Sequence, residues 1–258
     1  MRRPSLIFVA LVVALVAGGW VAWTGWGNPD IGVFVFVTAG WLVSLCLHEF
    51  AHAYMAYRGG DRSVAERGYL TLNPLRYSDA LLSIALPLLF VLMGGLGLPG
   101  GAVRVNPAAL NSRLRQAMVS AAGPLANVVI VLPLLAVLVL VGPRAGTQVA
   151  FWSGVALLVF LEATAILLSL LPIPGLDGFG MVEPWLPRRW VRSLASLSGL
   201  GLLLLVGLLW IPELNRWFFQ QVFAVLRWLG VSEFLVRLGL GFFRFWTYRS
   251  LGVGLIGS

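Results

Sequence analysis

The chain of 258 residues has two histidines, four residues apart, in the sequence His48-Glu49-Phe50-Ala51-His52. Histidine is the commonest metal ligand among side chains. On a helix, positions i and i+4 project from the same face, so both imidazoles can bind one metal ion. Glu49 then lies beside the open coordination position, where a proton acceptor is needed. The motif predicts one Zn²⁺ site with His48 and His52 as ligands and Glu49 as the catalytic residue.

A catalytic zinc ion usually has three protein ligands, so a distant third ligand is expected. Cys46, the one cysteine, lies two residues before His48 and therefore on a different face of the helix. Most acidic residues, Asp61 among them, fall in polar segments where a solvated charge is expected. Glu162 is an exception because it lies inside an apolar run, where an ionisable group is costly. Asp177 is the other, because the prolines and glycines around it break the helix there.

The composition is that of a membrane protein, with 59% hydrophobic and 11% charged residues. Apolar runs of about 20 residues, long enough to cross a bilayer, recur along the chain. We therefore expect an α-helical polytopic membrane protein in the cell inner or plasma membrane, with the lipid bilayer as a partner. The positive charge is all arginine and forms no compact patch, so we expect no nucleic-acid partner. The runs are 5–24, 31–57, 80–98, 114–141, 148–170 and 194–211.

The arginines predict the orientation of these runs. The N-terminal segment 1–30 has the basic start of a secretory signal, but its apolar run is long, which favours a retained signal-anchor helix over a cleaved signal. With Arg2 and Arg3 inside, the second run returns, and His52 lies near its cytoplasmic end. If 80–98 spans the membrane, the later arginines fall outside. If 80–113 dips in and returns on the same side, they fall inside, and its glycines and prolines favour this re-entrant hairpin.

The re-entrant topology also separates the two candidate third ligands. The run 148–170 then travels towards the cytoplasm and delivers Asp177 to the depth of His48 and His52. Glu162 would lie about 22 Å further along a straight helix, at ~1.5 Å per residue. Asp177 is therefore the predicted ligand, and Glu162 is predicted to be a packed or functional polar residue.

Four sequence stretches together resemble the site-2 protease family of intramembrane zinc metalloproteases, of the compact prokaryotic type without PDZ or CBS domains. The His48–His52 motif and Leu171-Pro172-Ile173-Pro174-Gly175-Leu176-Asp177-Gly178 carry most of the resemblance. Gly68-Tyr69-Leu70-Thr71-Leu72-Asn73-Pro74 and Ala122-Gly123-Pro124-Leu125-Ala126-Asn127 support it.

The resemblance implies a three-helix metalloprotease core at 31–57, 114–141 and 148–178, with peripheral helices around it. It implies zinc ligation by His48, His52 and Asp177, with Glu49 as acid and base. It also implies cleavage of membrane-anchored proteins, such as an anti-sigma factor or a tethered regulator, in regulated intramembrane proteolysis. Ser169 stands where family members commonly have asparagine, and its hydroxyl has fewer hydrogen-bonding atoms than an amide.

Several residues are candidates for substrate binding. Ser169 could donate a hydrogen bond to substrate, and Asn127 either binds the substrate backbone or packs between helices. The alternating stretches Tyr69–Asn73, with Asn73 as a further candidate, and Ala102–Asn106 predict a β-like hairpin. These stretches either offer an edge to an unwound substrate or pair with each other.

The whole chain divides into three predicted regions: a signal-anchor helix at 1–30, an intramembrane metalloprotease core at 31–193, and a C-terminal membrane helix with interfacial amphipathic helices at 194–258. Arginines and glutamate interrupt 214–246, which favours interfacial amphipathic helices there. The alternatives are a metalloprotease or lipid hydrolase with another substrate, and an inactive scaffold or transporter with a vestigial zinc site. The presence of all four site residues together disfavours the inactive protein.

Overall fold

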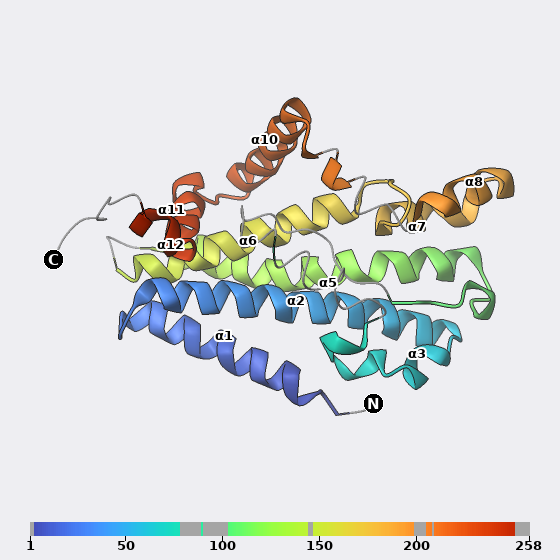
Figure 1. Ribbon diagram of the computed structural model, residues 1–258, viewed down its shortest axis with the longest axis horizontal. Coiled ribbons are helices and arrows are strands. Elements are labelled where there is room, and N and C mark those ends of the chain that lie inside the picture. Colours follow the sequence, from blue (N-terminus) through green and yellow to red (C-terminus); the bar gives the residue numbers. More distant parts are fainter. Residues whose placement is uncertain are drawn as a thin grey trace.

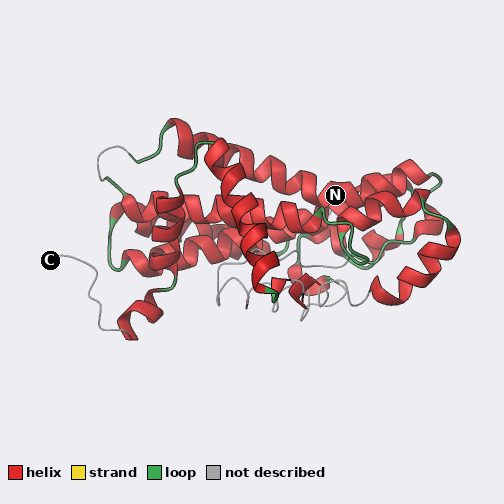
Figure 2. Ribbon diagram, turned by 90° about the horizontal axis from the view of Figure 1, so that it is seen from above, coloured by secondary structure: helices red, strands yellow, loops and turns green. Residues whose placement is uncertain are grey.

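The computed structural model describes residues 3–77, 89, 103–143, 147–198, 205–207 and 209–250. Every regular element among these residues is a helix (Figure 2). Four helices are long and apolar enough to cross a membrane, and they lie side by side along the long axis (Figure 1). They are α1 (Leu6–Thr24), α2 (Pro29–Gly59), α5 (Arg113–Leu140) and α6 (Val149–Ser169). The prediction of an α-helical polytopic membrane protein is confirmed.

Polar caps set where α1, α2 and α5 begin. Ser5 Oγ accepts the Phe8 N–H at 3.2 Å at the start of α1. Asn28 Oδ1 accepts the Asp30 N–H at 2.9 Å at the start of α2, and Ser112 does the same for α5. The sequence therefore specifies these helices twice, by an apolar run and by the capping residue before it.

The helix α6 is the centre of the bundle. Buried residues make up 78% of its most apolar window, against 17% for α1 and 22% for α5, which leaves those two helices with faces free for lipid. It runs parallel to α2, since Gly154 lies against Phe36 and Gly40 lies against Leu158 further along both helices. The helix α5 runs in the opposite direction, because Arg115 near its start donates to the carbonyl of Gly59 at the end of α2 (3.3 Å).

The end of the bundle where α2 ends and α5 begins is called the basic end. The start of α1 also lies there, because the Ser5 N–H donates to the Thr71 carbonyl at 2.9 Å. Short helices gather at this end (Figure 1): α3 (Ser63–Glu66), η1 (Tyr69–Thr71), η2 (Pro74–Arg76), η4 (Pro107–Ala109), α7 (Asp177–Val182), η5 (Glu183–Trp185) and α8 (Arg188–Ser198). Arginines of the segments 58–76, 104–115 and 188–192 therefore share this end of the molecule.

The predicted re-entrant hairpin at 80–113 falls largely on residues 78–88 and 90–102, which lie outside the described residues. Its two flanks are described. The Tyr77 hydroxyl donates to the Cys46 carbonyl at 3.0 Å, and the Val103 backbone lies close to Glu49. Both flanks thus contact the same turn of α2, well inside the bundle, and the hairpin stays a prediction.

The expected strand at Tyr69–Asn73 is wrong. Residues Tyr69–Thr71 form a 3₁₀ helix, and Gly68 and Leu72 on either side have left-handed backbones (φ 79° and 55°). The Asn73 side chain caps the next 3₁₀ helix by accepting the Leu75 N–H at 3.0 Å. Glycine and Asn-Pro turn chemistry has overridden the alternating pattern. Of the second stretch, Val103–Asn106 is described and has no regular secondary structure.

The C-terminal helices cover α6 on its remaining side. They are α10 (Pro212–Trp228), α11 (Glu233–Phe243) and α12 (Phe245–Ser250). Phe160 of α6 stacks on two phenylalanines of α10, and Leu226 and Phe243 are at most 1% exposed in the main core. Trp217 and Trp228 on the other face are exposed. These helices are amphipathic, as expected for 214–246. The predicted run 194–211 lies partly outside the described residues.

Candidate metal centre

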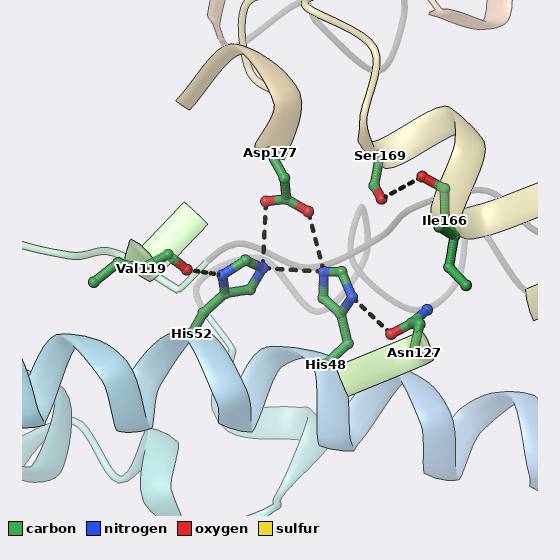
Figure 3. A network of polar contacts seen from close by, with 7 residues as sticks. All are labelled: His48, His52, Val119, Asn127, Ile166, Ser169 and Asp177. Carbon is green, nitrogen blue, oxygen red and sulfur yellow. Dashed lines mark hydrogen bonds and ion pairs between the residues drawn. The ribbon is translucent and has the colours of Figure 1, made fainter. Parts of the chain in front are cut away.

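The two histidines of α2 and the aspartate that begins α7 converge at one point (Figure 3). Asp177 Oδ2 lies 3.3 Å from His48 Nε2, and Asp177 Oδ1 lies 3.3 Å from His52 Nε2. The two Nε2 atoms are 3.0 Å apart. Among the described residues, these three form the one group of histidine, cysteine or acidic side chains with ligand atoms close enough to share a metal ion. Both histidines are buried.

The spacing of the donor atoms is of the size that a zinc ion needs. Zinc binds histidine nitrogen and carboxylate oxygen at about 2.0–2.2 Å, which puts neighbouring ligand atoms of a tetrahedron about 3.3–3.5 Å apart. The two nitrogens are 3.0 Å apart, and each lies 3.3 Å from a different carboxylate oxygen of Asp177. Three protein ligands leave the fourth position open, which is the arrangement of a catalytic site.

Hydrogen bonds to the far side of each imidazole select the tautomer that binds metal. His48 Nδ1 lies 2.9 Å from Asn127 Oδ1, and His52 Nδ1 lies 2.7 Å from the Val119 carbonyl. Both partners are acceptors, so each Nδ1–H donates and each Nε2 presents a lone pair. Two lone pairs 3.0 Å apart repel each other unless a cation lies between them. The donor set therefore favours a bound metal ion.

Gly123 of α5 provides the space beside the two Nε2 atoms. A Cβ atom at this position would lie against His52 Nε2 and 2.5 Å from His48 Nε2. The backbone of α5 therefore approaches the metal position as closely as a residue without a side chain allows. Pro124 follows it within the same helix.

Asp177 reaches the histidines because the chain turns sharply after α6. The prolines at 172 and 174 end that helix, and a Cβ atom at Gly178 would meet the Leu171 carbonyl oxygen at 2.7 Å. Each Asp177 oxygen thereby faces the Nε2 atom of one histidine.

Glu49 adjoins the group without belonging to it. Its side chain is buried, and it interacts electrostatically with His48, His52 and Asp177. It follows the ligand His48 directly in α2.

Glu162 is not part of the metal group. It is fully buried in α6, and neither carboxyl oxygen has a hydrogen-bond partner within the standard distance. Its polar neighbour is Ser44 of α2, one helical turn before His48. The structure therefore brings Asp177, and not Glu162, to the histidines.

The three predicted substrate-binding residues have different surroundings. Asn127 orients His48, an arrangement that the sequence did not suggest. Ser169 is the last residue of α6, and its hydroxyl donates to the Ile166 carbonyl of the same helix at 3.0 Å (Figure 3). Asn73 caps a 3₁₀ helix next to Ser5, which hydrogen-bonds to Thr71 and Leu72.

Sequence reasoning missed three residues around the centre. The Val119 carbonyl leaves no sequence signal, because any residue type supplies it. Gly123 lies in a recognised motif, but only its closeness to the histidines reveals its purpose. Asp61 was expected to be a solvated charge, and this was wrong: the residue is 2% exposed. Its signal was its position directly after Gly59-Gly60 at the end of α2.

Comparison with known proteins identifies close relatives. The chain is 48% identical over 252 residues to a protein of Mycolicibacterium smegmatis named "Putative zinc metalloprotease Rip2", with 95% of each chain covered. It is 46% identical to the protein of the same name from Mycobacterium tuberculosis, again over 95% of each.

A more distant relative is Bacillus subtilis "Putative zinc metalloprotease YwhC", 30% identical over 66% of this chain and 78% of that protein. No family model and no solved structure matches the chain. Zinc is thus the cofactor that the relatives' names and the convergent group indicate together. The chain belongs to the compact site-2 protease family of zinc metalloproteases.

Proposed function

We propose that the protein is an intramembrane protease in which His48, His52 and Asp177 bind zinc and Glu49 is the acid and base. The observation that carries the proposal is the depth of the ligand group. His52 and His48 lie seven and eleven residues before Gly59, the last residue of α2. At ~1.5 Å per residue, they lie roughly 10 and 16 Å inside the helix end. A substrate therefore has to be cut within or near the membrane.

Zinc, when bound, supplies a Lewis acid that polarises a carbonyl group and makes a water molecule more acidic. Glu49 takes a proton from the attacking water and then gives it to the leaving amine nitrogen. The peptide C–N bond breaks, and the products are a carboxylate and an amine. Asn127 and Val119 hold the imidazoles in one orientation throughout, so the ligands need no rearrangement during the reaction.

We infer that the basic end faces the cytoplasm. Arg58 lies in the last turn of α2, and Arg62 and Arg67 follow the helix at this end. The Arg67 guanidinium donates to the carbonyl of Arg104 at 3.1 Å. Arg113 and Arg115 begin α5 at the same end. Cytoplasmic loops of membrane proteins carry an excess of arginine and lysine. This distribution supports an active site on the cytoplasmic side of the plasma membrane.

The proposed substrates are single-pass membrane proteins, such as an anti-sigma factor or a tethered regulator. A helix hides its scissile carbonyl in its own hydrogen bonds and must unwind before water can attack. Ser169 stays a proposed substrate contact, although its hydroxyl would first have to leave the Ile166 carbonyl. Asn127 and Asn73 stay proposed contacts because of their positions in the sequence.

The experiment compares the wild-type protein with Glu49→Gln on a panel of tagged single-pass helices in phospholipid vesicles. We expect the substitution to preserve zinc and to reduce cleavage about 10³-fold or more, because the proton acceptor is lost. Mass spectrometry of the products should place the cut within or next to the apolar segment. Equal cleavage by both proteins, or cuts confined to distant soluble regions, would refute the proposal. An inactive scaffold would cleave nothing in either form.

A further inference from the structure

Asp61 is a buried carboxylate that joins two segments far apart in sequence. Its Oδ1 accepts hydrogen bonds from the Ser63 N–H and hydroxyl, at 3.0 and 2.7 Å. Its Oδ2 accepts the backbone N–H of Asn106 at 2.7 Å. Three hydrogen bonds compensate its burial. One oxygen therefore fixes the chain after α2, and the other fixes the segment Val103–Asn106.

The segment Val103–Asn106 has the burial pattern of an extended chain, and Asn106 has extended backbone angles (φ −91°, ψ 102°). Val103 and Val105 are half-buried and pack against a small apolar cluster, whereas Arg104 and Asn106 are exposed. In an extended chain, the N–H and C=O groups of alternate residues point to the same edge. The Arg104 carbonyl and the Asn106 N–H therefore share one edge, and the Val103 N–H lies on the other.

Each edge of this segment has its own partner. On the first edge, Arg67 Nη1 donates to the Arg104 carbonyl at 3.1 Å and Asp61 accepts the Asn106 N–H. On the second edge, the Val103 backbone lies close to the Glu49 carboxylate. Holding the first edge therefore fixes how the second edge meets Glu49.

We propose that Asp61, assisted by Arg67, is a positioning residue that aligns Glu49 for proton transfer through the segment Val103–Asn106. This rests on the proposed role of Glu49. Asp61 touches no reactant itself. It sets the orientation of the carboxylate that does, and small misplacements of catalytic groups cost rate more than binding.

The test measures kcat and KM for a tagged single-pass helix in phosphatidylcholine–phosphatidylglycerol vesicles, together with bound zinc. In Asp61→Asn, the amide NH₂ group faces the donor groups of either Ser63 or Asn106, so a hydrogen bond to that residue is lost. We therefore expect kcat to fall about 10- to 100-fold. We expect KM to change less than about twofold and zinc to stay at one per chain, because neither ligand geometry nor substrate contact changes. Glu66→Gln, an exposed residue five positions away, removes the same charge and should match the wild type.

A coupling measurement separates positioning from general damage. In a Glu49→Asp background, where the shorter carboxylate no longer meets Val103, Asp61→Asn should lower kcat by less than twofold. An equal fold-loss in both backgrounds would overturn the proposal. So would an unchanged kcat in zinc-loaded Asp61→Asn.

Two milder variants decide the question if Asp61→Asn fails to fold. Arg67→Gln removes the hydrogen bond to the Arg104 carbonyl on the first edge and should lower kcat about threefold at constant KM. Ser63→Ala leaves the Asn106 bond intact and should keep kcat near the wild-type value. The reverse pattern would show that Asp61 only caps the turn after α2. Loss of the proposed function itself would look different, because Glu49→Gln would then cleave as well as the wild type.

Discussion

Substitution of Gly123 by alanine should remove zinc while leaving the bundle folded. The added Cβ would lie 2.5 Å from His48 Nε2 and 2.6 Å from His48 Cε1, and in contact with His52 Nε2. Zinc itself lies about 2.0–2.1 Å from a histidine nitrogen, so the methyl group competes with the metal for the same space. Loss of a residue that only orients a ligand costs 10–100-fold in metal affinity. A direct steric block should therefore cost more than about 100-fold.

The same substitution should leave the protein folded. Alanine is favoured over glycine inside a helix by about 1 kcal/mol, which offsets part of the cost of moving the two histidines aside. The assay is zinc content of the purified protein by mass spectrometry, with thermal unfolding of metal-free samples in parallel. Gly154→Ala is the matched control, since its nearest neighbour would be a Phe36 ring carbon at 3.3 Å. A Gly123→Ala protein with one zinc per chain and wild-type cleavage would refute the geometry of the site.

Further predictions follow from other contacts of the centre. Asn127→Ala should weaken zinc binding about 10–100-fold, measured by competition with a fluorescent chelator, because His48 loses its orienting acceptor; undiminished affinity would contradict this. Asp177→Asn should lose zinc, whereas Glu162→Gln should keep it; the opposite result would reassign the ligand. A cysteine at position 104 should react with a membrane-impermeant maleimide only from the cytoplasmic side, and Cys46, which is buried, serves as the unreactive internal control. Labelling from the outside would show that the basic end faces away from the cytoplasm.

The sequence was informative wherever a chemical requirement and a membrane constraint coincided. The two histidines predicted an incomplete metal site, and the depth argument singled out Asp177, which lies 3.3 Å from both. The apolar runs predicted four long helices to within two residues of their observed ends.

Contacts between distant segments could not be predicted in the same way. The alternation at Tyr69–Asn73 favoured a strand, but the backbone at Gly68 and Leu72 turns through left-handed conformations. Asp61 resembles any charge at a helix end, and its burial depends on a segment 45 residues later. In the sequence, Gly123 is an ordinary glycine of a membrane helix. Its role depends on its contact with the histidines of α2.

The most direct test of the metal centre is X-ray absorption spectroscopy at the zinc edge of the purified wild-type protein. The structure predicts two imidazole nitrogens and carboxylate or water oxygens at about 2.0–2.2 Å, with no sulfur shell. A sulfur ligand at about 2.3 Å would implicate Cys46, and a single imidazole would remove one histidine from the site. Either result would contradict zinc binding by His48, His52 and Asp177.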